Sequence, residues 1–148
     1  MTAGRSVTHE NLGAWVIKCN PQKTPLAPMV AAGEAKRSWC VADNYRSGLM
    51  QPGQRALFWV SAHRRRGFWG AGIITGVATR EDGRLHVPVE IPLFGAPLTA
   101  AELSTVPELA TLELFRSPQQ ANPSWVSKRE VRILDRLLDV HWNRATPR

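Results

Sequence analysis

Tryptophan recurs beside small polar residues in this chain, and this pairing has the clearest chemical meaning. Trp39 stands five residues before Asn44, and Trp59 stands two before Ser61. Planar bases stack on aromatic side chains, at about 1–3 kcal/mol per base. Amide and hydroxyl groups can read a base edge because they both donate and accept hydrogen bonds. Trp69 joins this set because the glycines that follow it would allow a ligand or another backbone to approach closely.

The alternative for every aromatic residue is packing in the core, because large aromatic side chains bury extensive apolar area. We expect Phe58 and Phe68 to pack in this way. Packing is also the favoured interpretation for Trp15, Trp125 and Trp142. The candidate walls of a binding pocket are therefore Trp39, Trp59 and Trp69.

The chain is basic, with 19 Lys and Arg against 12 Asp and Glu and a formal charge of +7. A basic surface favours polyanions, so nucleic acid is the leading partner. Arg64, Arg65 and Arg66 lie together in one expected loop and are candidates for phosphate contact. A solvated hairpin tip explains the same three residues equally well, and both interpretations stay open.

Catalytic and metal-binding signatures are absent from the sequence. It contains no nucleophile elbow, P-loop or zinc-protease helix motif. The four histidines fall in different expected elements, and the two cysteines, Cys19 and Cys40, have no nearby partners for a zinc site. We therefore expect no catalytic residue, no metal and no cofactor, and an enzyme would have to use a constellation that sequence patterns do not reveal.

Short strands alternate irregularly with short helices. Aromatic and β-branched runs predict strands over residues 14–19, 55–62, 68–79, 84–94 and 111–116, with Pro88 and Pro92 placing the fourth at an edge or splitting it. Helix formers and capping boxes predict helices over 29–37, from Asn44, from Thr99 and over 127–139. An Asp-Gly pair within residues 81–83 predicts a hairpin turn.

This pattern predicts an α+β fold with a β-barrel of five or six strands and peripheral helices. We expect a single domain over residues 13–142, with flexible ends at 1–12 and 143–148. The sequence contains no apolar run long enough to cross a bilayer, and its first residues lack the apolar segment of a signal peptide. The expectation is a cytoplasmic monomer that does not contact membranes.

Four blocks of the sequence resemble the EVE family. Residues 15–21 (WVIKCNP) resemble its opening, aromatic-apolar-apolar-Lys-Ser-Glu-Pro, and residues 39–44 match its W-x-x-x-x-N spacing. Residues 53–61 (GQRALFWVS) resemble G-D-x-x-x-F-Y-H-S, and residues 67–77 resemble the following glycine-rich strand. The blocks occur in the family's order. The sequence departs from the pattern at Asn20, Asp43 and Val60, where the family has Glu, Arg and His.

EVE domains are similar to YTH and PUA domains. The resemblance implies a PUA-like β-barrel with a pocket for one base, used to recognise modified DNA or RNA. It assigns motif positions to Trp39, Asn44, Trp59 and Ser61, and to Lys18 and Asn20 in the opening block. These six residues and Trp69 are the predicted base-binding set.

The sequence thus predicts a non-catalytic reader with an aromatic pocket for a methylated or hydroxymethylated nucleobase. The base would be flipped out of a duplex or already single-stranded, because one methyl-sized group alone contributes only about 1–3 kcal/mol in an apolar pocket. The expected partner is nucleic acid that carries a modified base. A nuclease or other effector encoded nearby is an open option. The alternative is a barrel that binds a small molecule or a protein and no nucleic acid.

Overall fold

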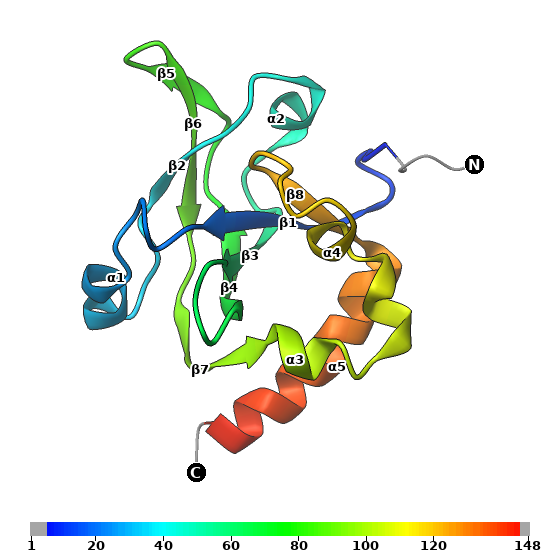
Figure 1. Ribbon diagram of the computed structural model, residues 1–148. Coiled ribbons are helices and arrows are strands. Elements are labelled where there is room, and N and C mark those ends of the chain that lie inside the picture. Colours follow the sequence, from blue (N-terminus) through cyan, green and yellow to red (C-terminus); the bar gives the residue numbers. More distant parts are fainter. Residues whose placement is uncertain (1–5, 146–148) are drawn as a thin grey trace.

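The computed structural model describes residues 6–145, and their side chains as far as residue 139. Its described residues form one eight-stranded mixed sheet with strand order β2-β6-β4-β3-β1-β8, in which β5 pairs with β6 and β7 pairs with β4 (Figure 1). The strands are β1 (Leu12–Cys19), β2 (Ser38–Cys40), β3 (Arg55–Val60), β4 (Gly67–Ile74), β5 (Thr79–Glu81), β6 (Arg84–Glu90), β7 (Leu93–Thr99) and β8 (Ser124–Ser127).

Short helices connect the strands, and a long one ends the chain. They are α1 (Ala27–Ala32), α2 (Tyr45–Leu49), α3 (Ala100–Leu103), the 3₁₀ helix η1 (Pro107–Thr111), α4 (Glu113–Arg116) and α5 (Lys128–Ala145). The predicted capping boxes are confirmed at Thr99 and at Ser127, where the Ser127 hydroxyl accepts from the Glu130 N–H. Helix α2 begins with a further capping box, at Asn44, which the sequence analysis did not predict. Helices α3, α4 and α5 gather on one side of the sheet, and α1 lies on the other (Figure 1).

Two buried clusters lie on the two faces of the curled sheet, because side chains alternate along each strand. In β1, Trp15 and Ile17 enter the inner cluster that the sheet curls around, whereas Val16 enters the outer cluster beneath α3, η1, α4 and α5. In β3, Phe58 is inner and Trp59 is outer. This alternation decides which predicted site residues can meet.

The sheet curls until its two edges approach each other. The Ala42 N–H donates to the Asn122 carbonyl at 2.8 Å, joining the segment after β2 to the segment before β8. Curling also brings β4 against the β6–β7 segment, where a Cβ on Gly72 would lie 2.0 Å from the Glu90 carbonyl oxygen. The close approach at this glycine is therefore made by backbone.

The fold class expected from the sequence, an α+β fold with a curled barrel-like sheet, is confirmed, but two details were wrong. The sheet has eight strands because the short β2, β5 and β8 escaped prediction and because residues 84–94 divide at Pro92 into β6 and β7. Residues 111–116 are not a strand. They belong to η1 and α4, whose apolar residues Leu112 and Leu114 are buried in the outer cluster.

Three smaller predictions can be compared with the structure. Asp82 and Gly83 both adopt positive φ, at 51° and 77°, and form the predicted hairpin turn between β5 and β6. Helix α5 buries Leu134 completely, as expected, and continues to Ala145, beyond the predicted end of the helix at residue 139. Residues 1–5 and 146–148 of the predicted flexible ends lie outside the described residues. Within the described part of the chain, no helix has the length and apolar character needed to cross a membrane.

Candidate nucleic-acid interface

A pocket of about 470 Å³ opens where the carboxyl ends of β1 and β3 meet α4 and the segment before β8. Its lining combines cationic, amide, hydroxyl and aromatic side chains: Lys18, Asn20, Lys23, Trp59, Ser61, Arg66, Leu114, Phe115, Pro118, Gln119, Gln120 and Asn122. Four of the predicted base-binding residues and one of the predicted phosphate-binding residues therefore share one pocket. They are Lys18, Asn20, Trp59, Ser61 and Arg66.

The parallel pairing of β1 with β3 brings these residues together. Lys18 is directly opposite Trp59 in the register, and one residue further along the Ser61 N–H donates to the Cys19 carbonyl at 2.9 Å. Lys18 and Asn20 share one face of their strand, as do Trp59 and Ser61, because side chains alternate with a period of two. Both faces belong to the outer side of the sheet, so the four side chains border the same space.

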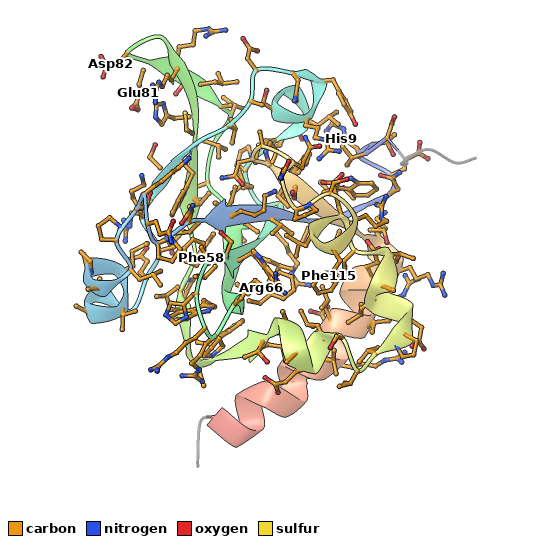
Figure 2. The ribbon with its side chains drawn as sticks, viewed as in Figure 1. His9, Phe58, Arg66, Glu81, Asp82 and Phe115 are labelled. Carbon is orange, nitrogen blue, oxygen red and sulfur yellow. The ribbon has the colours of Figure 1, made fainter. Side chains whose placement is uncertain are left out.

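Two aromatic side chains contribute to the pocket. Trp59 is only 4% exposed and packs edge-to-face against Phe68 and Phe115, with ring centroids 4.9 and 6.0 Å apart. It therefore lines the pocket as a nearly buried ring with little surface open to a ligand. Phe115, a residue of α4, is partly exposed and lines the pocket together with Arg66, which directly precedes β4 (Figure 2). Phe115 therefore offers the accessible ring for stacking.

The outer wall of the pocket, residues 117–122, is held by polar contacts to β1. The Lys18 ammonium donates to the Pro118 carbonyl at 3.3 Å and also to the Gln120 carbonyl. The Asn122 amide spans the Lys18 backbone, accepting from its N–H at 2.8 Å and donating to its carbonyl at 3.1 Å. The Asn122 side chain thus makes the hydrogen bonds to the Lys18 backbone that a neighbouring strand would otherwise make. It thereby holds the outer wall of the pocket against β1.

Positive charge dominates the pocket. Among its described lining residues, Lys18, Lys23 and Arg66 are cationic and none is a carboxylate. Burial lowers the pKa of Lys18 below its ordinary value, the nearby Glu113 carboxylate opposes this shift, and Arg46 adds to it. A pocket with this lining favours an anionic ligand.

Several polar groups remain available for a ligand. The Ser61 hydroxyl donates to the Cys19 carbonyl at 3.2 Å and keeps its lone pairs for accepting. The side-chain oxygen of Asn20, Oδ1, accepts from the Gln22 N–H at 2.9 Å, which leaves the NH₂ of the same amide as a donor. The Gln119 and Gln120 side chains add further amides at the rim. Donors and acceptors therefore converge on one concave space, as edge recognition requires.

The predicted arginine loop has a fixed backbone and projecting side chains. The Arg65 N–H donates to His63 Nδ1 at 2.9 Å, the Trp69 indole N–H donates to the Arg65 carbonyl at 3.0 Å, and the Ala100 N–H donates to the Arg66 carbonyl at 2.7 Å. All three arginine side chains are exposed. Arg66 reaches the pocket lining, whereas Arg64 and Arg65 flank it in the sequence.

The expectation that Trp39 and Trp59 wall one pocket is wrong. Trp39 is 5% exposed and lies in the inner cluster, with its ring centroid 5.4 Å from that of Phe58. Trp59 lies in the outer cluster, on the opposite face of the sheet. The reason is that β2 pairs with β6 at the far edge, which turns the Trp39 ring into the barrel interior.

Asn44 and Trp69 also lie outside the pocket. The side-chain oxygen of Asn44, Oδ1, accepts from the Arg46 N–H at 2.9 Å, because Asn44 is the N-cap residue of helix α2. Trp69 packs against the inner cluster and its ring meets His63 edge-to-face, with centroids 5.0 Å apart. Trp69 thus supports the arginine loop through its bond to Arg65. Neither residue is part of the pocket lining.

Sequence reasoning missed the α4 side of the pocket. Phe115, Gln119 and Gln120 come from a segment predicted as a strand and the loop after it. A signal was present in residues 112–115, where three apolar residues flank one carboxylate. That pattern does not match the strict alternation of a half-buried strand.

Comparison with known proteins gives structural matches alone. No protein-family model matches the chain, and no curated protein matches it in sequence. The solved structures of similar fold include a hypothetical protein from Leishmania major, at 19% identity and a TM-score of 0.69, with 90% of this chain and 99% of that chain covered.

The human THYN1 protein, solved in complex with DNA that contains 5-methylcytosine, aligns over 84% of this chain and 96% of its own, with 18% identity and a TM-score of 0.64. A protein from Rhodopseudomonas palustris aligns over 82% of this chain and 90% of its own, at 22% identity and a TM-score of 0.62. At such low identity the likeness establishes the fold alone, which is the α+β curled sheet with peripheral helices that the sequence predicted.

Proposed function

We propose that this protein is a non-catalytic reader of the EVE family that binds one modified nucleobase in the pocket between β1, β3 and α4. The base is methylated or hydroxymethylated and comes from DNA or RNA, either flipped out of a duplex or single-stranded. The observation that carries the proposal is the make-up of the lining, in which three cations, several amides, a hydroxyl and two aromatic rings face one space without a carboxylate.

Each part of a nucleotide has a matching group in the pocket. The volume of about 470 Å³ lies within the range of small-ligand sites. Phe115 would stack on the base and the nearly buried Trp59 would close the space behind it. Ser61 and Asn20 would read the base edge, and Lys23 and Arg66 would contact phosphate. Lys18 would add charge while it holds the wall. Arg64 and Arg65 would contact phosphates further along the strand.

The human THYN1 complex supports the same proposed function. That protein shares the fold of this chain and was solved with DNA that contains 5-methylcytosine. The identity of 18% leaves the base and the polymer open. This chain therefore has to be tested against several modifications in both DNA and RNA. No cofactor and no catalytic residue enter the proposal.

The test is a binding panel of single-stranded and duplex 13-mers that carry cytosine, 5-methylcytosine, 5-hydroxymethylcytosine, adenine or N6-methyladenine at the centre. The expected result is tighter binding of one modified strand than of its unmodified parent. Phe115→Ala should weaken that binding by about 1–3 kcal/mol, the contribution of one stacked base. Ser61→Ala should reduce the preference for the modified base more than the total affinity, because edge contacts specify and phosphate contacts position.

Matched controls separate the pocket from general damage. Ser38→Ala removes a partly buried hydroxyl from β2, outside the pocket lining, and should leave the preference unchanged. If the affinity depended neither on the base modification nor on the salt concentration, the proposed reader function would be contradicted. Such a result would favour the alternative, a barrel for a small molecule or a protein, because phosphate contacts impose a steep salt dependence.

A further inference from the structure

A second pocket adjoins the first and shares two of its lining residues. It also has a volume of about 470 Å³, and Arg66 and Phe115 contribute to the walls of both pockets. The rest of its lining comes from α3, η1 and the turn between them, and most of it is aliphatic, including Ala101, Leu103 and Val106. The candidate base site and this apolar space therefore lie next to each other, with Arg66 and Phe115 at their boundary.

Backbone geometry holds Arg66 at this boundary. Its carbonyl accepts from the Ala100 N–H at 2.7 Å, which ties the arginine loop to the start of α3. The next residue is Gly67, where a Cβ would lie 2.3 Å from the Leu98 carbonyl oxygen, so only glycine allows this approach. The Arg66 side chain is exposed, and among the described residues it forms no ion pair. A fixed backbone thus presents an uncommitted cation between the two pockets.

We propose that the second pocket binds the nucleobase next to the modified one on the same strand, and that Arg66 contacts the phosphate that joins the two nucleosides. This proposal rests on the proposed function of the first pocket. An aliphatic lining suits the flat face of any base and provides few groups to read its edge. The second pocket would therefore add affinity with little sequence preference. The adjacency of the two pockets and the positive charge at their boundary favour a neighbouring nucleotide over a free apolar molecule.

The experiment uses a single-stranded DNA 13-mer with one central 5-methylcytosine and two versions of it, each with an abasic analogue on one side of the modified base. Fluorescence anisotropy at fixed salt measures the affinity of the full chain for each strand. The expected result is that one of the two abasic strands binds at least about fivefold more weakly, the lower end of what one stacked base contributes.

Ala101→Trp fills the second pocket from α3, because Ala101 is an exposed residue of its lining. This variant should bind the intact strand as weakly as the wild type binds the affected abasic strand, and it should not distinguish the two strands. Ala110→Trp, from the η1 wall, should behave in the same way. The matched control is Ala31→Trp, an exposed position on α1 outside both pocket linings, which should behave like the wild type.

Two results would overturn the proposal for the second pocket and leave the proposed function of the first pocket unaffected. One is equal binding of all three strands by the wild type. The other is that Ala101→Trp still binds the intact strand more tightly than the affected abasic strand, to the same degree as the wild type. A hydrophobic dye that binds the wild type but not Ala101→Trp, and that the strand does not displace, would overturn the proposal in favour of an apolar small molecule. If no strand of the panel binds the wild type, the proposed function itself fails, and the second pocket fails with it.

Discussion

Arg46 and Glu113 form a buried two-pronged ion pair that joins α2 to α4 directly behind the pocket wall. The two guanidinium nitrogens lie 2.8 and 2.7 Å from the two carboxylate oxygens. The same guanidinium also donates to the Pro123 carbonyl at 3.1 Å, so it fixes the segment that leads into β8. Hydrogen bonding to Glu113 raises the pKa of Arg46 above its ordinary value. This pair positions α4, and with it Phe115, against the sheet.

Breaking one side of this pair should destabilise the protein strongly. Glu113→Gln leaves the Arg46 charge buried without its partner, and we expect a loss of about 3–5 kcal/mol in the free energy of unfolding. The double variant Arg46→Met, Glu113→Leu should lose less than the single one, because no charge is then left buried. Urea denaturation of the three proteins gives the comparison.

The exposed pair Arg55–Asp135 offers the control, with N–O distances of 2.9 Å. Its side chains are 39% and 47% exposed, so solvent screens the interaction. Asp135→Asn should therefore change the stability by only about 0–1 kcal/mol. Equal losses for Glu113→Gln and Asp135→Asn would contradict the role given to the buried pair.

Trp39 should act on stability and not on ligand discrimination. Its ring fills the barrel interior against Phe58, and its indole N–H donates to the Lys36 carbonyl at 2.6 Å. Trp39→Ala should lower the free energy of unfolding by about 3–5 kcal/mol through the cavity it leaves. At a temperature where the variant is still folded, its preference for a modified over a plain strand should equal that of the wild type. A lost preference in a folded variant would place Trp39 in the ligand site after all.

The arginine loop should govern the salt dependence of binding. Replacing Arg64, Arg65 and Arg66 together with Ala should weaken every sequence alike. The slope of log K against log salt should fall by up to about 0.9 per lost contact on duplex DNA, or about 0.7 on a single strand. A matched variant replaces the three exposed α5 residues Arg129, Arg132 and Arg136 and removes the same charge. If both triple variants change the slope equally, the effect is one of net charge and the loop has no specific role.

Sequence patterns predicted those parts of the fold that depend on near neighbours. The capping box from Ser127 to Glu130, the Asp82-Gly83 turn and the aromatic and β-branched run of residues 14–19 each involve residues within a few positions of one another. Short strands such as β2 and β8 exist only because a distant strand pairs with them. Three or four residues carry too little periodicity to reveal such pairing.

The candidate site could be predicted in part for the same reason. Alternation within each strand puts Lys18 with Asn20, and Trp59 with Ser61, but their meeting requires the parallel register of β1 and β3, about 40 positions apart in the sequence. Trp39 looked equally suitable by residue type, and the pairing of β2 with β6 directs it into the barrel. Phe115 was missed because residues 111–116 were predicted as a strand, and its place beside the pocket depends on the packing of α4 over the outer cluster, whose residues are distant in the sequence.

Lys18 gives the last prediction, which concerns pH. Burial lowers its pKa below the ordinary value of 10.5, in spite of the opposing field of Glu113. The folded protein thus releases this proton at a lower pH than the unfolded chain. Between the lowered pKa and 10.5 the unfolded state binds more protons, and this residue makes the folded state more stable as pH rises. Binding of an anionic strand should show the opposite trend, because the pocket loses a positive charge in the same window.

Two measurements check this. The NMR titration of the Lys18 side chain should have its midpoint below 10.5, with Lys18→Met used to assign the resonance. Affinity for the modified strand should decline with pH through that midpoint in the wild type and in Lys23→Met, which removes an exposed charge from the same pocket. Lys18→Met should bind more weakly at neutral pH and lack this decline. A Lys18 midpoint at or above 10.5 would contradict the prediction, because it would mean that burial does not disfavour the charged form of this ammonium group.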